Sequence, residues 1–212
     1  MLAFTACGGD DEQPAASSTA TPEDTGGEQG SGCTPAERPV PKDARFEQPK
    51  QRLAPGKTYV ATVTTNCGAF EITLDSKRAP KTGGSFKSLA DKGFYDGLGF
   101  HRIVPGFVIQ GGDPNGDGSG GPGYSVVEAP PRTLKYVKGV VAMAKTGIEA
   151  AGTSGSQFFV VTGDAGLPPE YALVGKVTQG QEVVDKIGVV PVSPDEQPVE
   201  PIVIESVAVA AS

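Results

Sequence analysis

Short runs of β-branched and aromatic residues, separated by glycine, asparagine and proline, recur along the chain from Thr58 onward. Apolar runs of this length, bounded by turn residues, predict strands rather than helices. The predicted strands are residues 59–65, 70–74, 100–113 with an interruption at Pro105-Gly106, 124–128, 139–144, 156–162, 173–177 and 202–209. Many short strands with few helices between them indicate a closed antiparallel barrel rather than a sheet of strand–helix–strand units.

Two segments have the pattern of helices. The first begins at residues 79–82, where a proline suits a first turn, and ends at Gly93 after an apolar stripe. The second covers residues 181–187 and is followed by Gly188, placed in the C′ position that commonly closes a helix. Both helices are short, so the predicted fold is mainly β.

The segment before the barrel differs in composition. Residues 8–32 contain six acidic residues, no basic residue and no large apolar side chain. Such a segment cannot bury enough surface to offset its conformational entropy. We therefore predict that residues 8–57 form a disordered acidic tether followed, from Cys33, by a proline-rich extended arm, and that residues 58–212 form the barrel domain.

The first seven residues place small side chains before Cys7 and an acidic run after it. This order resembles the end of a bacterial lipoprotein signal peptide, whose cysteine is acylated. The segment lacks basic residues and falls short of the roughly 7–15 apolar residues of a secretory signal, and Phe4 stands where leucine is usual. We interpret residues 1–7 as a remnant of such a signal, which predicts an anchor at the outer face of the bacterial cytoplasmic membrane, or otherwise secretion. The alternative is an ordinary terminus with a chance cysteine.

The overall charge excludes some classes of partner. A net charge of −7 argues against nucleic-acid binding, which needs a basic surface to neutralise phosphates. It also gives no attraction to an anionic membrane, so we expect membrane contact only through the lipid anchor. One domain with an acidic tether predicts a monomer.

Two cysteines remain besides Cys7. In an exported protein, Cys33 and Cys67 would form a disulfide that ties the arm to the first hairpin and closes a loop of about 35 residues. Two free thiols are the alternative, and both readings stay open.

The 100–113 segment combines apolar and functional side chains without a break. If its pleat is regular, Ile103 and Ile109 lie on one face. The side chains then expected on the other face are Phe100, Arg102, Val108 and Gln110. Pro105-Gly106 interrupts the pleat and resets the register. An arginine, an aromatic ring and a glutamine on one surface favour a neutral ligand rich in carbonyl groups, such as a peptide.

Three weaker motifs do not support other functions. Residues 113–123 match half of a calcium loop and also a dinucleotide fingerprint, but helices are missing where both motifs need them. We interpret this segment as an ordered surface loop. The 152–155 segment resembles the nucleophile loop of a serine protease, but His101 lies within a strand and is expected to point away from the pocket face.

Two longer blocks carry a family resemblance. Residues 100–113 (FHRIVPGFVIQGGD) and 155–159 (GSQFF) resemble the signature blocks of the cyclophilin family of peptidyl-prolyl isomerases. The resemblance extends from about Tyr59 to Ala208. It implies a closed eight-stranded antiparallel β-barrel capped by two α-helices, with activity on X-Pro peptide bonds and with neither cofactor nor metal.

The same resemblance assigns expected roles to individual residues. Arg102 matches the family's catalytic arginine, and Gln110 and Gln157 match the polar residues beside it. Gln110 is expected to orient the guanidinium or bind the substrate carbonyl, so Arg102 and Gln110 are the predicted catalytic residues. The residues that match the walls of the proline pocket are Phe107, Val108, Phe159 and Leu167.

Four positions on the predicted rim depart from the family pattern or adjoin a departure. Ala144 and Lys145 lie where the family binds the substrate backbone through an Ala-Asn pair. Tyr171 stands where many members have histidine, and Gly166 where many have tryptophan. Cyclosporin binding in the family uses that indole, so we expect weak cyclosporin binding.

The resemblance thus predicts an isomerase that acts on proline-containing peptides and on exported or unfolded protein clients. A peptide-binding or chaperone module with incidental isomerase activity is the alternative.

Overall fold

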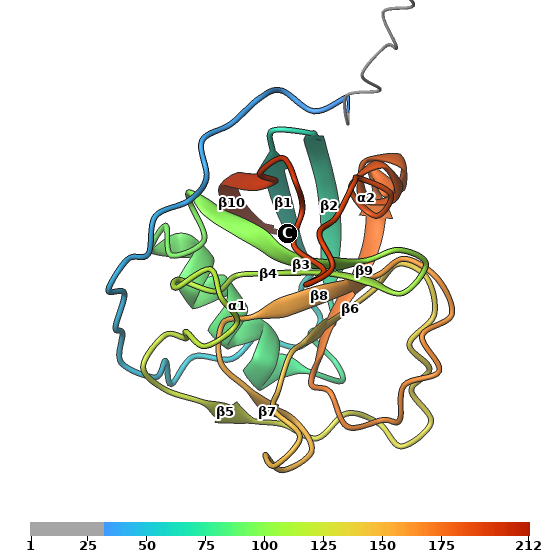
Figure 1. The fold of residues 1–212 in the computed structure, drawn as a ribbon. Coiled ribbons are helices and arrows are strands. Elements are labelled where there is room, and N and C mark those ends of the chain that lie inside the picture. Colours follow the sequence, from blue (N-terminus) through green and yellow to red (C-terminus); the bar gives the residue numbers. More distant parts are fainter. Residues whose placement is uncertain (1–31) are drawn as a thin grey trace, which may run out of the picture.

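The computed structural model describes residues 32–212 (Figure 1). The predicted signal-peptide remnant, with Cys7, and nearly all of the predicted tether lie outside the described residues. Among the described residues, neither helix has the length and apolarity needed to cross a membrane.

Eight strands close into an antiparallel barrel, as predicted. They are β1 (Tyr59–Thr65), β2 (Gly68–Leu74), β3 (Leu98–Val104), β4 (Val108–Gly111), β6 (Val140–Met143), β8 (Phe158–Val161), β9 (Leu173–Gln179) and β10 (Val203–Ala211). Around the barrel the order is β1-β10-β3-β4-β8-β6-β9-β2. This order brings β3, β4, β8 and β6 side by side. Arg102, Val108, Gln110 and Phe159 lie on β3, β4 and β8, and the other predicted site residues lie in the segments between the strands.

The predicted strand at 124–128 is much shorter in the structure. Only β5 (Val126–Val127) is extended, and it pairs with β7 (Thr153–Ser154), a strand that was not predicted, in a separate two-stranded sheet. The Glu128 carboxylate instead accepts hydrogen bonds from the backbone N–H groups of Lys81, at 3.0 Å, and Thr82, at 2.8 Å. These N–H groups belong to the first turn of a helix, where they have no intrahelical partner. Glu128 therefore ends the strand by capping a helix.

The two predicted helices are present as α1 (Pro80–Asp91) and α2 (Gln181–Ile187), on opposite sides of the barrel in Figure 1. Gly93 follows α1 with a φ of 64°, as a closing glycine should. Gly188, predicted at the C′ position of α2, is instead its C-cap residue and has a right-handed backbone with a φ of −67°. The left-handed glycine lies before α2 instead, at Gly180, where a Cβ atom would come within 2.5 Å of the Ala69 carbonyl oxygen.

Alternation along β8 separates two apolar clusters. Phe158 points into the barrel, where its ring packs edge-to-face on Phe86, Tyr95 and Phe100. Phe159 points outward into a second cluster that includes Val108. The barrel interior is therefore filled with side chains, and any binding site on these strands must lie on their outer face.

The arm from residue 32 to residue 57 runs along the outside of the barrel, in blue in Figure 1. Its Leu53 is 2% exposed, and its Phe46 packs edge-to-face on Phe94 at 5.8 Å. A Cβ atom on Gly84 of α1 would lie 2.5 Å from the carbonyl oxygen of Gln51. The helix therefore needs glycine there so that the arm backbone can approach it closely.

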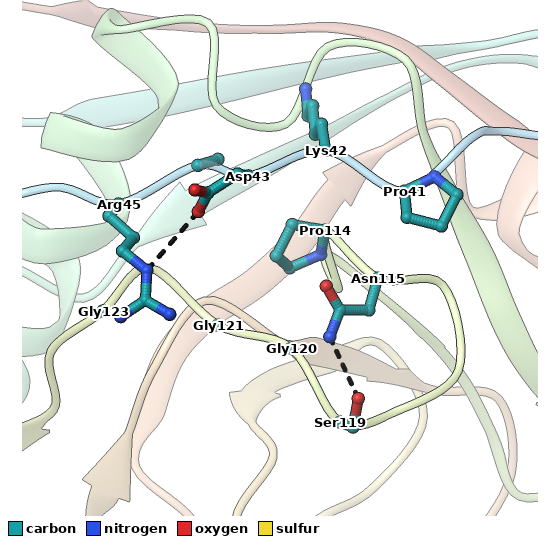
Figure 2. Close-up of a pocket in the computed structure, with 11 residues that line it drawn as sticks. Pro41, Lys42, Asp43, Arg45, Pro114, Asn115, Ser119, Gly120, Gly121 and Gly123 are labelled. Atoms are coloured by element: carbon teal, nitrogen blue, oxygen red, sulfur yellow. Dashed lines mark hydrogen bonds and ion pairs between the residues drawn. The ribbon is translucent and has the colours of Figure 1, made fainter.

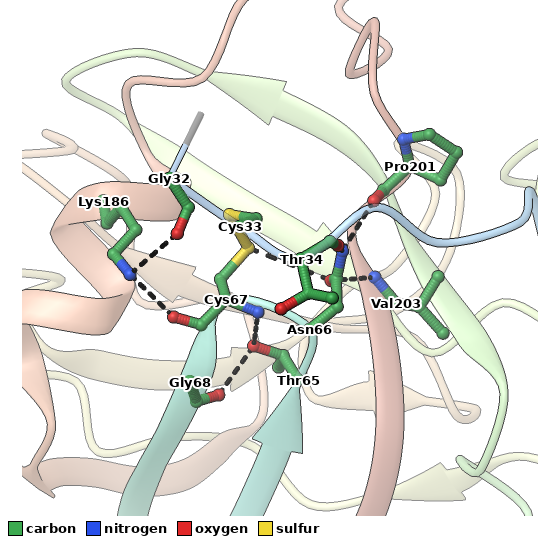
Figure 3. The surroundings of a disulfide bond; sticks show 10 residues. All are labelled: Gly32, Cys33, Thr34, Thr65, Asn66, Cys67, Gly68, Lys186, Pro201 and Val203. Carbon is green, nitrogen blue, oxygen red and sulfur yellow. Dashed lines mark hydrogen bonds between the residues drawn. A yellow bond between two sulfur atoms is a disulfide. The ribbon is translucent and has the colours of Figure 1, made fainter. Parts of the chain in front are cut away.

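A disulfide joins Cys33 to Cys67, in the turn between β1 and β2 (Figure 3). Thr34 and Asn66 exchange hydrogen bonds beside it, both at 2.7 Å. Lys186 of α2 donates to the Cys67 carbonyl oxygen at 2.8 Å. The bridge predicted for an exported protein is thus present and fixes the start of the arm to the barrel.

The arm also crosses the 113–123 loop. The Lys42 N–H donates to the Pro114 carbonyl at 3.0 Å, and the Phe46 N–H donates to the Pro122 carbonyl at 2.8 Å. Between these contacts lies a cavity of about 480 Å³ lined by prolines, glycines and charged or polar side chains (Figure 2). It has no large apolar wall, so it lacks the surface that would hold a proline ring.

Candidate active site

A β-bulge at His101 decides which side chains of β3 face the site. The pairing of β3 with β4 matches Phe100 with Gly111 but Arg102 with Gln110, so one residue of β3 is extra. Phe100 consequently points into the core, whereas Arg102 points outward. The expectation that Phe100 shares a face with Arg102 is therefore wrong, because the register shifts at the bulge. The register reset expected at Pro105-Gly106 is not found, since these residues form the hairpin turn and the flanking pairs, Ile103 with Ile109 and Val104 with Val108, stay in regular register.

The outer face of β3, β4 and β8 carries a cavity of about 150 Å³. The residues that line it are Arg102, Phe107, Val108, Gln110, Ala144, Lys145, Phe159, Leu167 and Tyr171. These are nine of the ten residues predicted for catalysis and substrate binding. The tenth, Gln157, lies beside the cavity and accepts a hydrogen bond from Gln110 Nε2 at 3.0 Å.

Two aromatic rings packed edge-to-face form one wall of the cavity. Phe159 is 4% exposed, and the Tyr171 ring meets it edge-to-face with centroids 5.5 Å apart. Behind them, Tyr136 Oη donates to the Tyr171 carbonyl at 2.6 Å and accepts from the Tyr171 N–H at 3.0 Å. Burial raises the pKa of Tyr136 to about 12, so this hydroxyl stays protonated. Tyr136 was not predicted, since a single aromatic in a polar segment gives no signal of its contact with Tyr171.

Polar contacts hold the opposite wall. Arg102 Nε donates to Glu196 Oε2 at 2.6 Å, and Arg102 Nη1 donates to Gln110 Oε1 at 3.4 Å. Gln157 Nε2 donates to two carbonyl oxygens of the 113–123 loop, each at 2.9 Å. Hydrogen bonds thus connect Arg102 through Gln110 and Gln157 to the 113–123 loop. Glu196 was missed by sequence reasoning.

Lys145 lines the cavity with its side chain but uses its ammonium group elsewhere. The side chain is 5% exposed, and Nζ donates to the carbonyl oxygens of Thr146 and Glu149, both at 3.2 Å. Nζ also lies 3.6 Å from a carboxylate oxygen of Glu170 and 5.5 Å from the centre of the Tyr171 ring. A buried cation with these partners is compensated, so this departure from the family pattern is accommodated.

The residues that resembled other motifs take structural roles. Asp113 is buried and its carboxylate accepts hydrogen bonds from the N–H groups of Asn115, at 2.9 Å, and Asp117, at 3.0 Å. No group of His, Cys, Asp and Glu able to hold a metal ion occurs within residues 32–212. Ser154 Oγ donates to the Val126 carbonyl at 3.3 Å rather than to a histidine.

His101, the extra residue of the bulge, points toward a separate cavity of about 220 Å³ beneath the arm. Both of its ring nitrogens are buried without a hydrogen-bond partner among the described residues. Burial lowers the pKa of His101, Asp113 and Asp117 oppose the shift, and Arg102 adds to it. The neutral ring is therefore the form that the folded protein favours.

This burial predicts a pH dependence of stability. The unfolded chain binds a proton at His101 more readily than the folded protein does, because the pKa of His101 is lowered in the fold. The contribution of the neutral ring to the free energy of unfolding is therefore complete above the unfolded pKa of about 6.5 and decreases as the pH falls below it. We expect the Tm of the wild type to decrease between pH 6.5 and 5 more steeply than that of His101→Gln. Parallel profiles in this range, where ordinary carboxylates stay ionised, would contradict the assignment.

A closed antiparallel eight-stranded barrel with two helices, and with an outer pocket that joins one arginine to aromatic and aliphatic walls, is the architecture expected of a cyclophilin-like peptidyl-prolyl isomerase. The family model for "Cyclophilin type peptidyl-prolyl cis-trans isomerase/CLD" matches residues 60–209. The chain belongs to this family, and it is a peptidyl-prolyl cis-trans isomerase of the cyclophilin type.

Individual relatives agree with this assignment. A peptidyl-prolyl cis-trans isomerase of Helicobacter pylori is 42% identical over 146 residues, which cover 67% of this chain and 86% of the relative. Peptidyl-prolyl cis-trans isomerase A of Mycobacterium tuberculosis is 37% identical over 176 residues, or 74% and 95% of the two chains. A crystal structure of a cyclophilin-type isomerase from Cryptosporidium parvum has a TM-score of 0.67 and 32% identity, covering 72% of this chain and 98% of that one. A second structure of that enzyme was determined in the presence of the dipeptide Ala-Pro.

Proposed function

We propose that Arg102 is the catalytic residue of this isomerase and that the enzyme acts on X-Pro bonds of exported or unfolded protein clients. The observation that carries the proposal is the cavity that joins the Arg102 guanidinium to apolar walls made by Val108 and Phe159. The charged group and the apolar surface thus line the same cavity, which is about the size needed to hold a proline ring.

The chemistry follows from the electronic structure of the peptide bond. Resonance of the nitrogen lone pair with the carbonyl produces a rotation barrier of about 18–20 kcal/mol. As the bond twists, the lone pair localises on the prolyl nitrogen, which becomes a better hydrogen-bond acceptor. A donor aimed at this nitrogen stabilises the transition state more than either planar ground state. The reaction then needs no nucleophile and no proton transfer.

Arg102 has the donors for this step. Two of its N–H groups are used, one at Nε by Glu196 and one at Nη1 by Gln110. A guanidinium carries five such groups and stays charged at any working pH. The others remain for a substrate in the cavity that Arg102 lines. Gln110 would thus orient the guanidinium, and it is itself held by Gln157.

The remaining site residues would hold the substrate. The pyrrolidine ring would pack on the apolar residues Phe107, Val108, Phe159 and Leu167, with the Tyr171 ring beside them. The Ala144 N–H already donates to the Gln157 carbonyl at 2.9 Å, which leaves the Ala144 carbonyl to face a substrate backbone. Lys145 would contribute its aliphatic stem, because its ammonium group is engaged.

The client class can be tested by refolding. We expect the enzyme to accelerate both isomerisation of a proline tetrapeptide and refolding of an unfolded protein limited by proline isomerisation, which takes tens of seconds or longer unaided. Binding of the tetrapeptide with no acceleration of its isomerisation would favour the alternative, a peptide-binding or chaperone module.

Export is supported by the Cys33–Cys67 disulfide, since such bridges persist mainly in oxidising compartments. We propose that the protein works outside the cytoplasmic membrane, as a monomer anchored through a lipid on Cys7. Mass spectrometry of the native protein would detect diacylglycerol on Cys7, whereas an unmodified Met1 would contradict the anchor.

Weak cyclosporin binding also remains a proposal, and a submicromolar dissociation constant in a titration would reject it.

A further inference from the structure

A short turn from the segment after α2 reaches the edge of β3 at Arg102. β10 pairs with β3 only through Val203 and Ile204, opposite Gly99 and Leu98 at the end of β3 that is away from Arg102. Nearer the site, the Glu196 carbonyl accepts a hydrogen bond from the Ile103 N–H at 2.7 Å. Glu196 therefore contacts β3 twice, through its backbone at Ile103 and through its carboxylate at Arg102.

Glu196 has an unusual backbone for its side chain. Its φ of 62° is the only positive value at a non-glycine residue in the part of the chain that the structure describes. Glycine or asparagine would adopt this conformation more readily. The turn is held by hydrogen bonds between Ser193 and Glu196, at 3.0 Å, and between Ser193 and Gln197, at 2.8 Å. A residue in this conformation whose side chain ends on a site arginine points to a functional role for that contact.

The ion pair between Arg102 and Glu196 contributes little to the stability of the fold. The side chains of Arg102 and Glu196 are 37% and 44% exposed, and exposed pairs contribute little to folding. Its geometric effect is larger. With Glu196 on Nε and Gln110 on Nη1, the plane of the guanidinium is restrained from two sides. A free arginine would instead sample many rotamers and present its donors to the substrate only part of the time.

We propose that Glu196 is a positioning residue: its carboxylate holds the Arg102 guanidinium in the orientation that donates to the twisted X-Pro bond. The inference rests on the proposed catalytic role of Arg102. It predicts a loss in kcat with little change in KM, because Glu196 does not line the proline cavity. It also predicts that the effect of Glu196 passes through Arg102.

The test compares Glu196→Ala and Glu196→Gln by line-shape NMR on a proline tetrapeptide. Glu196→Ala should lower kcat by about five- to tenfold, the effect of losing about one charge-assisted contact. Glu196→Gln should lose less, about two- to threefold, because its amide oxygen can still accept from Nε. KM should stay within about twofold in both variants. The Arg102 Nε–H resonance should exchange slowly with water in the wild type and rapidly in Glu196→Ala.

Asp195→Ala is the matched control, since it removes an exposed carboxylate from the same turn and should leave kcat unchanged. In an Arg102→Ala background, Glu196→Ala should have no further effect. An unchanged kcat in Glu196→Ala, while Arg102→Ala is impaired, would overturn the inference alone. Full activity of Arg102→Ala would overturn the proposed function beneath it. A kcat loss from Glu196→Ala that persists without Arg102 would show a general structural effect and also reject the positioning role.

Discussion

Replacing Arg102 with alanine is expected to lower kcat by about 100-fold, the size of effect seen when one donor to a developing charge is removed. The guanidinium is the charged donor that lines the proline cavity opposite the aromatic wall. Lys145 cannot replace it, because the Lys145 ammonium is held by Thr146 and Glu149. KM should change by less than about threefold, since the apolar walls that hold the ring remain.

The fold should survive this substitution. Arg102 lies on the outer face of the barrel, whereas the adjacent Ile103 is fully buried in the core. Arg102→Lys separates charge from geometry, because lysine keeps the charge but lacks the planar fork that contacts Glu196 and Gln110 together. We expect Arg102→Lys to recover little activity. Equal acceleration of tetrapeptide isomerisation by wild type and Arg102→Ala, with unchanged Tm, would refute the mechanism.

Loss of the Cys33–Cys67 bridge is expected to destabilise the protein by about 4 kcal/mol in the chain-entropy model. The bridge spans a sequence separation of 34 residues, so it restricts a long loop in the unfolded chain. For a domain of this size the loss corresponds to a decrease in Tm of about 10 °C. Reduction of the wild type, followed by thermal unfolding under reducing conditions, measures the effect.

The kcat of the reduced protein should be unchanged at temperatures well below its Tm. None of the nine residues that line the proline cavity comes from the arm or from the β1–β2 turn. The Cys33→Ala/Cys67→Ala double variant is a control in which Cys7 cannot form an incorrect bridge with a remaining partner. A Tm decrease below about 2 °C would show that Phe46 and Leu53 hold the arm without the bridge, and would contradict the predicted contribution.

The family motifs predicted most of the site residues, whereas alternation by itself grouped Arg102, Val108 and Gln110 correctly but placed Phe100 on the wrong face. Val108 and Gln110 lie two residues apart on β4, and the pleat places them on one face. Phe158 and Phe159 are adjacent and therefore lie on opposite faces, one in the core and one in the pocket. The resemblance supplied the roles of Leu167 and Tyr171, which periodicity alone does not place in the pocket.

The errors lie where local rules do not apply. The bulge at His101 turns Phe100 into the core, although the sequence places the visible interruption at Pro105-Gly106. The strand expected at 124–128 stops early because Glu128 caps α1, more than forty residues earlier in the chain. The bulge is an extra residue in a hairpin ladder, which period-two alternation does not reveal. At Glu128, a contact with a distant segment overrides the local pattern.

By itself, the sequence determined the barrel class, the two helices and the pocket residues, because these follow from alternation, turn chemistry and family motifs. It left open whether Cys33 and Cys67 are bridged, which the tertiary structure decided. Only the tertiary structure decided the contact of Glu196 with Arg102, 94 residues apart, and that of Tyr136 with Tyr171, 35 residues apart. Neither pair has a periodicity that links its members. Such contacts depend on how the barrel closes and where a turn meets its edge, and no local propensity encodes those positions.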